Sequence, residues 1–132
     1  MLLRYFFVVA LAMHGLAHIT GFIASWTSLP AGYPEKPWVL SSSVTLQSPI
    51  GRVFGALWLV ASVTLVGAAV GLVRRSEWWP GLAMAGATLS LLVILPWWNT
   101  VPPGAKIGAA FDVLVMLALL LPLREQIMGA MR

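Results

Sequence analysis

The chain contains only two histidines, and they stand four residues apart. His14 and His18 lie inside the first long apolar run, from Tyr5 to Ile23. A spacing of four residues places both imidazoles on one face of an α-helix, one turn apart. Imidazoles can ligate a metal, relay a proton or hydrogen-bond a ligand. Two histidines on one helix are an incomplete site for most of these reactions, so the chemistry depends on what other helices bring to them.

The composition places this pair in a membrane protein. Hydrophobic residues make up 60% of the chain, charged residues 9%, and the mean hydropathy is +0.91. These values exclude a soluble domain, which needs more polar side chains to cover its surface. Three further apolar runs have about the length of a bilayer crossing: Val53 to Val73, Trp78 to Trp98, and Ile107 to Leu123.

We therefore predict an all-α fold, a transmembrane antiparallel four-helix bundle that forms a single membrane domain over residues 1–132. The connections 74–77 and 99–106 are short, which favours antiparallel packing of sequential helices. The predicted helices cover residues 3–26, 51–73, 78–97 and 105–123. Residues 27–49 are rich in proline and are predicted to form an irregular extracytoplasmic loop.

The first apolar run also has features of a secretory signal peptide. Arg4 precedes it, and the small residues at 15–17 resemble a cleavage site. The apolar stretch continues beyond that point through Ile19 and Ile23, so we expect an uncleaved helix. Cysteine is absent from the sequence, which excludes disulfides, thiol catalysis and thiolate metal sites.

The distribution of basic residues predicts an orientation in the membrane. One side of the four-crossing arrangement carries Arg4, Arg74, Arg75, Arg124 and Arg132, and the other carries Lys36, Arg52 and Lys106. The larger set should be cytoplasmic, which places both termini in the cytoplasm. The net charge of +4 is then a topology signal and an attraction to anionic lipid. No basic stripe is long enough to indicate nucleic-acid binding.

Two further patterns bear on packing and depth. Tryptophans are expected at the membrane interfaces, at positions Trp26, Trp78, Trp79, Trp97 and Trp98. Glycines repeat at a spacing of four, which lets helices approach closely, in the pairs Gly51 and Gly55, Gly67 and Gly71, and Gly104 and Gly108. Asp112 follows Gly108 by four residues and is the only acidic residue in a predicted span. It should therefore face a neighbouring helix and not lipid.

Depth along the helices brings Asp112 near the histidines. At 1.5 Å per residue, His18 lies about 12 Å below Trp26 and Asp112 lies about 9 Å below Lys106. We predict a ligand pocket that opens to the outside, floored by His14 and His18 and walled by Asp112. Arg52 and Asn99 are predicted at its rim.

Three roles remain open for this group of residues. Asp112 could pair with His18 or Arg52 and fix helix register, because an unpaired buried carboxylate costs a few kcal/mol. The group could instead bind or transform a lipophilic molecule such as a quinone or a sterol. His14, His18 and Asp112 also have the residue types of a two-histidine, one-carboxylate metal site. Since they supply only three ligands, we predict no metal and assign no cofactor.

Several short motifs resemble those of a known group of proteins. They are Met13-His14-Gly15-Leu16-Ala17-His18, Gly21-Phe22, Gly55-Ala56-Leu57-Trp58-Leu59 and Ala105-Lys106-Ile107-Gly108. The chain resembles small uncharacterised bacterial four-helix membrane proteins, some of which are labelled transporter permeases. The resemblance implies a multi-pass protein of the bacterial inner membrane and no established reaction. Asparagine is usual in that group where this chain has Asp112, which weakens the metal-site interpretation. Helix number and size give a looser resemblance to the DoxX-like four-helix family.

The predicted function is that of an accessory or binding module with an outward-facing pocket for a lipophilic ligand. An ATP-driven permease would need a nucleotide-binding loop of the form GxxxxGK[ST], which the sequence lacks. The alternatives are a membrane redox enzyme or metal-binding protein using His14, His18 and Asp112, and a small oligomeric transporter. Expected partners are the lipid bilayer and either a second copy or a larger membrane complex.

Overall fold

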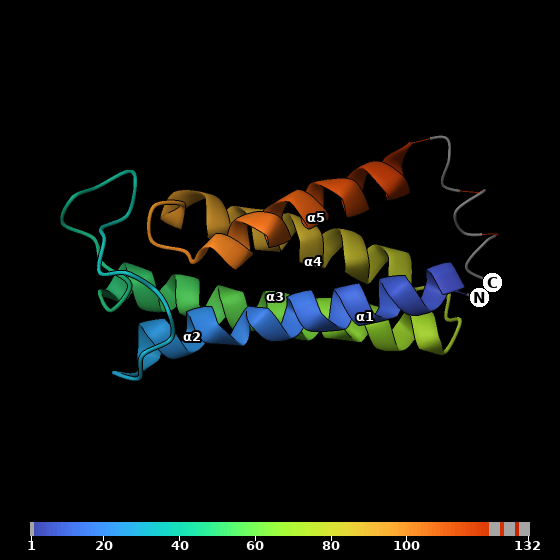
Figure 1. Cartoon of the computed structure of the whole chain (residues 1–132), viewed down its shortest axis with the longest axis horizontal. Helices are drawn as coiled ribbons and strands as arrows, with labels where there is room; N and C mark the ends of the chain where they lie inside the picture. Colours follow the sequence, from blue (N-terminus) through green and yellow to red (C-terminus); the bar gives the residue numbers. More distant parts are fainter. Residues whose placement is uncertain (1, 122–124, 126–128, 130–132) are drawn as a thin grey trace.

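The chain folds into an antiparallel bundle of helices (Figure 1). The computed structural model describes residues 2–121, 125 and 129. Its elements are α1 (Leu2–Ala17), α2 (Ile19–Trp26), α3 (Pro49–Val73), α4 (Trp79–Ile94), the 3₁₀ helix η1 (Leu95–Trp97) and α5 (Pro103–Leu120). The predicted all-α, four-helix bundle is confirmed.

Within the described residues, four helical segments are long and apolar enough to cross a membrane. They are Leu2–Trp26, Pro49–Val73, Trp79–Trp97 and Pro103–Leu120. Many of their large apolar side chains point outward; Phe6, Val63 and Ile107 are each more than 60% exposed. Such a surface is stable only against hydrocarbon. The chain is a multi-pass membrane protein.

The first span breaks at His18, where the sequence predicts one continuous helix. The His18 N–H donates to the Gly15 carbonyl at 3.1 Å, and the Gly21 N–H donates to the His18 carbonyl at 3.1 Å. These are i to i−3 bonds, tighter than the i to i−4 bonds of an α-helix. The Thr20 hydroxyl donates to the Ala17 carbonyl at 2.7 Å. The Ala17 carbonyl therefore keeps a hydrogen-bond donor inside the membrane although the helix breaks beside it.

Local sequence sets the start of α3 two positions before the prediction. The Ser48 hydroxyl accepts the N–H of Gly51 at 3.2 Å, which caps the helix. Pro49 takes the first helical position, where its missing N–H leaves no bond unmade. Pro103 starts α5 in the same way.

The end of α5 also differs from the prediction. The helix stops at Leu120, and Leu121 is extended with φ −73° and ψ 159°. Leu121 precedes a proline, and the proline ring disfavours helical dihedrals at the preceding residue. The remainder of the predicted helix, residues 122–123, lies outside the described residues, as do Arg124 and Arg132 of the orientation argument.

The turn between α3 and α4 is closed by a left-handed residue. Arg75 has φ +56°. Its N–H donates to the Leu72 carbonyl at 3.2 Å, and the Ser76 N–H donates to the Gly71 carbonyl at 2.9 Å. This pair of bonds is the Schellman motif that ends many helices. It turns the chain tightly enough to place α4 antiparallel on α3.

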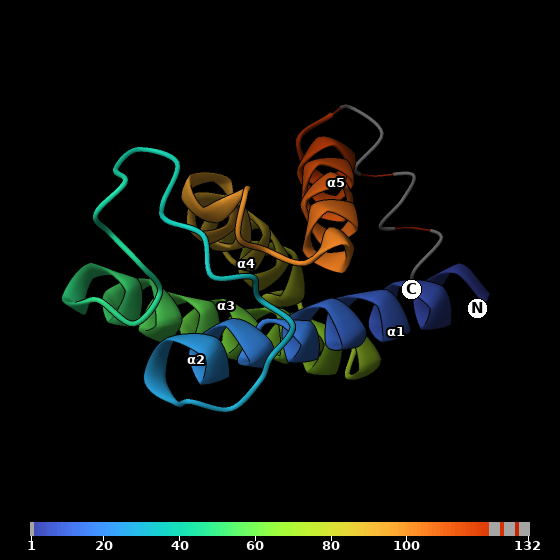
Figure 2. The same ribbon diagram turned by 60° about the vertical axis from the view of Figure 1, so that its left-hand side comes forward.

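The helices pack in sequence order, and the seam between the two outer elements has few backbone contacts. The first span packs on α3, α3 on α4, and α4 on α5. The two outer elements, α1 and α5, make few direct contacts, and Figure 2 shows α5 raised away from α1. The start of α1 and the end of α5 lie at one end of the bundle, opposite the long loop (Figure 1).

Two of the five predicted interfacial tryptophans belong to the core. Trp26, Trp78 and Trp98 are substantially exposed, whereas Trp79 is 4% and Trp97 is 0% exposed. Trp97 lies under the long loop, where Trp38 stacks on it with ring centroids 6.1 Å apart. The loop thus covers Trp97, and Trp79 packs into the core with Leu72 and Ala83.

Candidate functional site

Four polar side chains from three helices meet in the interior of the bundle. His14 Nε2 lies 2.9 Å from Asp112 Oδ1, and the Ser90 hydroxyl donates to Asp112 Oδ2 at 2.5 Å. His18 Nε2 lies 2.7 Å from Ser90 Oγ. The two imidazole rings pack edge to face with centroids 4.7 Å apart. We call His14, His18, Ser90 and Asp112 the polar cluster.

The cluster lies deep in the predicted hydrocarbon. His14 is near the middle of the 25-residue span Leu2–Trp26, and Asp112 is near the middle of α5. Asp112 and Ser90 are 0% exposed, His18 is 5% exposed, and the His14 side chain is 9% exposed. A buried carboxylate needs hydrogen-bond donors on its oxygens. His14 and Ser90 supply one to each oxygen.

Gly108 makes room for His14 between the outer helices. A Cβ atom at Gly108 would lie 2.7 Å from His14 Nδ1 and closer still to Cε1, so any larger residue would displace the ring. Nothing lies within 4 Å of the corresponding position at Gly104. Only one glycine of this predicted pair is therefore a packing contact, and it is the one beside Asp112. The Phe111 ring lies 5.6 Å from the His14 ring on the same wall.

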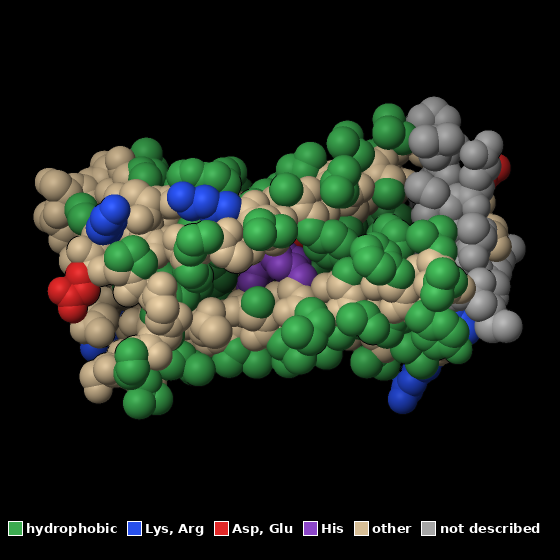
Figure 3. Space-filling view, in the orientation of Figure 1, with side chains coloured by type: hydrophobic (Ala, Val, Ile, Leu, Met, Phe, Trp, Pro, Cys, Tyr) green, Lys and Arg blue, Asp and Glu red, His purple; other side chains and the backbone are tan. Residues whose placement is uncertain are grey.

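The histidines can be reached from outside the bundle along the seam between α1 and α5. In Figure 3, histidine atoms are visible at the bottom of a furrow between α5 and the first span, with hydrophobic side chains on both sides. We call this the α1–α5 furrow. Because both of its walls are helices of a membrane span, it faces the side of the molecule and not the loop end.

Ser90 is the member of the cluster that the sequence analysis missed. It is the only polar residue on a stripe of small side chains along α4, Ala83, Ala87 and Ser90, all fully buried. Small residues at this spacing mark a packing face in membrane helices. Thr88, two positions earlier, is exposed. The spacing of this stripe therefore indicates that the Ser90 hydroxyl, and not that of Thr88, faces the interior of the bundle.

The other two predicted pocket residues lie apart from the cluster. Arg52 is exposed at the start of α3, with its guanidinium 6.0 Å from the centre of the Trp26 ring. Asn99 donates to the Pro37 carbonyl at 2.8 Å and so ties the long loop to the end of η1. The structure brings His14, His18 and Asp112 together, and it uses Arg52 and Asn99 at the loop end.

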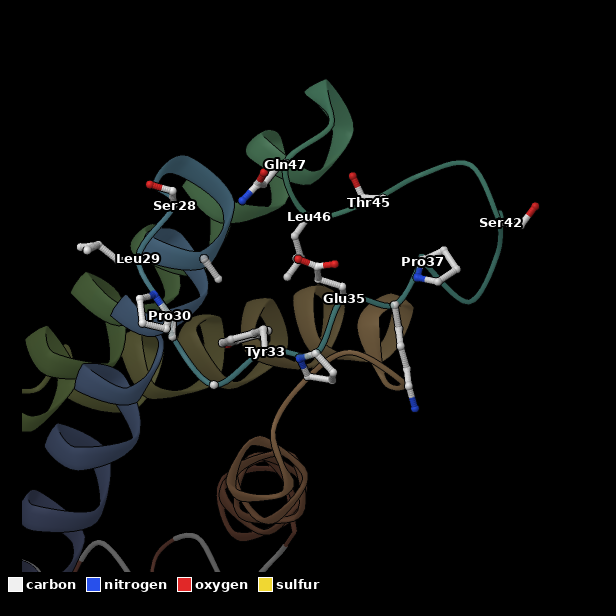
Figure 4. A pocket seen from close by; sticks show the side chains of 15 residues that line it. Ser28, Leu29, Pro30, Tyr33, Glu35, Pro37, Ser42, Thr45, Leu46 and Gln47 are labelled. Carbon is white, nitrogen blue, oxygen red and sulfur yellow. The ribbon is translucent and has the colours of Figure 1, made fainter.

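The loop end has its own pocket, of about 820 Å³. Figure 4 shows it between the long loop and the end of α2, with Tyr33, Glu35 and Gln47 among its lining residues. None of the five predicted pocket residues lines it. Burial raises the pKa of the Tyr33 phenol, an effect partly opposed by a hydrogen bond to Thr20. The pocket and the polar cluster therefore have no residue in common.

The positions of His14, His18 and Asp112 also bear on whether they could bind a metal ion. Within the described residues, no group of three or more histidine or carboxylate side chains is placed to hold a metal ion. His18 is bonded to Ser90, and the ring nitrogen that His14 presents to Asp112 is already engaged. The carboxylate orients an imidazole here, as carboxylates do around many functional histidines.

Comparison with known proteins adds no assignment. No family model matches the chain, and no curated protein or solved structure shows significant similarity to it.

Proposed function

We propose that the protein is a membrane binding module that takes up a lipophilic small molecule through the α1–α5 furrow. The polar head of the ligand would lie on His14 and His18, and its apolar part would lie between the helices. The observation that carries the proposal is a hydrogen-bonded, buried polar cluster with its two imidazoles at the floor of an apolar furrow.

A purely structural role explains less of this arrangement. A carboxylate that only fixes helix register is best served by a closed interface, because excluding other partners strengthens its hydrogen bonds. Here α1 and α5 stay apart, and the exposed part of the cluster is the imidazoles. Polar groups at membrane depth commonly mark ligand paths.

The direction of entry is part of the proposal. We propose the orientation drawn from the basic residues, with both termini cytoplasmic and the long loop outside, in a bacterial inner membrane. The furrow then opens toward the bilayer, where a lipophilic ligand is concentrated. The ligand would enter from the side and would not pass the pocket under the loop.

The experiment is thermal unfolding of the purified protein in detergent with a long-chain phenol, a quinone or a sterol. A ligand at 100 times its Kd adds about 2.7 kcal/mol to the free energy of unfolding. We expect saturable stabilisation of the parent protein by at least one compound. Ser90→Ala should weaken this response because His18 loses its partner.

The matched control is Ser62→Ala. Ser62 is also a buried serine, 3% exposed, but it lies on α3 and is not a hydrogen-bond partner of either histidine. It should keep the full response to ligand. A panel in which no compound stabilises the parent, or in which both variants respond equally, would contradict a binding role for the cluster.

A further inference from the structure

We propose that the pocket at the loop end is a second binding site, which takes a small organic molecule with a protonated amine and an apolar body. We call it the loop pocket; its lining includes Tyr33, Glu35 and Leu46. Its volume of about 820 Å³ is within the usual range of small-molecule sites, roughly 300 to 1,000 Å³. The loop pocket shares no residue with the polar cluster. Ligand binding there is therefore independent of lipophile binding in the α1–α5 furrow.

The apolar part of the loop pocket is anchored in the bundle. Ala24 lines it from α2, and Tyr33 and Leu46 line it from the long loop (Figure 4). Leu46 is 8% exposed and packs in one core cluster with Trp58 of α3. The Tyr33 ring also packs on Trp58, edge to face, with centroids 5.8 Å apart. These side chains form a surface that is already in place for the apolar body of a ligand.

Glu35 supplies a carboxylate to this surface. Figure 4 shows its side chain extending from the loop towards Leu46, whereas the Ser42 side chain points away from the other lining residues. Within the described part of the chain, the Glu35 carboxylate has no ion-pair partner. A carboxylate accepts charge-assisted hydrogen bonds from the N–H groups of an ammonium ion. A protonated amine can therefore bind here through its nitrogen while its apolar body lies on Tyr33 and Leu46.

The backbone on both sides of Glu35 is held in place. The Lys36 N–H donates to the Pro34 carbonyl at 2.8 Å, which closes a three-residue turn with Glu35 at its centre. The Thr100 hydroxyl, which is fully buried, donates to the Lys36 carbonyl at 2.8 Å. Asn99 donates to the carbonyl of the next loop residue at 2.8 Å. Because the loop is fastened to the end of η1 at these points, ligand binding has to order little additional backbone.

The charges around the loop pocket set the expected sign and size of the preference. Lys36 is the other charged residue of the lining, and its ammonium group repels a cation. Arg52 and Lys106 each lie over an indole ring and do not line the pocket. Glu35 is exposed, so solvent screens its attraction for an amine. The preference for a cation should therefore be modest and should increase when Lys36 is neutralised.

The experiment is calorimetric titration of the purified chain in detergent at neutral pH with three small probes. They are 2-phenylethylammonium, 2-phenylethanol and phenylacetate, which share a phenyl ring and differ in charge. We expect 2-phenylethylammonium to bind about fivefold more tightly than 2-phenylethanol, the upper end of the effect of an exposed ion pair. Phenylacetate should bind most weakly, because its carboxylate would lie against that of Glu35.

Three variants assign the effect to the loop pocket. Glu35→Gln keeps the size of the side chain and removes its charge, so 2-phenylethylammonium should bind no more tightly than 2-phenylethanol. Lys36→Gln removes the repelling charge and should tighten binding of the ammonium probe by about twofold. Glu77→Gln is the matched control, since Glu77 is an exposed glutamate in the turn between α3 and α4, at the other end of the bundle (Figure 1). It should bind all three probes as the parent does.

Several results would overturn the proposal. They are equal binding of the three probes, no saturable binding of any of them, or the same affinity for the ammonium probe in Glu35→Gln and Glu77→Gln. Phenylacetate as the tightest ligand, with binding lost in Lys36→Gln, would show an anion site instead. Loss of amine binding in Ser90→Ala would place the amine in the α1–α5 furrow. If amine binding behaves as expected and no lipophile stabilises the protein, the proposed function fails and the loop pocket stands.

Discussion

Substitution of Gly108 by alanine tests whether α5 is held in place by His14. A methyl group at this position would meet the Cε1–Nδ1 edge of the imidazole, with the distance to Nδ1 only 2.7 Å. The ring cannot withdraw freely because its Nε2 is bonded to Asp112. Either α5 moves outward or the hydrogen bond breaks.

The expected change in the free energy of unfolding of Gly108→Ala is the balance of opposing effects. Replacing glycine by alanine in a helix stabilises it by roughly 0.5 to 1 kcal/mol. Overpacking costs about 1 to 3 kcal/mol, and loss of one partner of a buried polar pair costs about 1 to 3 kcal/mol. Since one of these two costs applies and the helix gain offsets part of it, Gly108→Ala should lower the free energy of unfolding by up to about 2.5 kcal/mol.

Gly104→Ala is the matched control on the same helix. Nothing lies within 4 Å of its added methyl group, so only the favourable helix effect remains, and it is reduced because Gly104 is in the first turn. We expect this variant to be as stable as the parent protein or slightly more stable. The assay is equilibrium unfolding in mixed detergent and SDS micelles, followed by circular dichroism.

A double-mutant cycle makes the test specific. His14→Ala removes the ring that the new methyl group meets, so adding Gly108→Ala to it should cost little, and the coupling energy should be about 1 to 3 kcal/mol. If Gly108→Ala is as stable as Gly104→Ala, or if the two substitutions are additive, α5 does not depend on His14 for its position.

Three further predictions concern the ends of the bundle. Single cysteines at Ser43 and Glu77 of this thiol-free chain should be labelled by an impermeant reagent from outside and from inside the cell, respectively; the reverse pattern contradicts the proposed orientation. Arg75→Gly should raise the free energy of unfolding by about 0.5 to 1 kcal/mol, because Arg75 has φ +56° and glycine adopts this conformation without strain. Burial raises the pKa of Tyr33 above its ordinary 10.0, so its contribution to stability is complete below pH 10 and is lost as the pH rises through the folded-state pKa. Tyr33→Phe should remove this part of the pH dependence of thermal unfolding, and an unchanged profile would contradict it.

The number and approximate limits of the spans were readable from the sequence. Hydrocarbon imposes a minimum length and an apolar composition on any crossing helix, and both are properties of contiguous residues. The glycine stripe on α5 likewise indicated that Asp112 faces another helix. Asp112 is fully buried, with Gly108 packed on His14. Helix periodicity alone carries this information.

Local rules unused in the prediction account for most of the boundary errors. Ser48 and Pro49 together form a helix start, and a proline after Leu121 forms a stop. The break at His18 is different, because nothing in the run Gly15 to Gly21 requires it. It arises where Gly15 and Gly21 both pack closely on α3.

Membrane character, span number and the shared face of the two histidines were determined by the sequence alone, because each depends on contiguous residues or on a helical repeat. The tertiary structure decided that Ser90 joins the histidines and Asp112 in one network and that Arg52 and Asn99 lie apart from it. It also decided that α1 and α5 make few direct contacts and leave a furrow at the histidines. These features depend on the rotation and separation of helices distant in the chain. Side-chain packing across the whole bundle sets those variables, and no single segment encodes them.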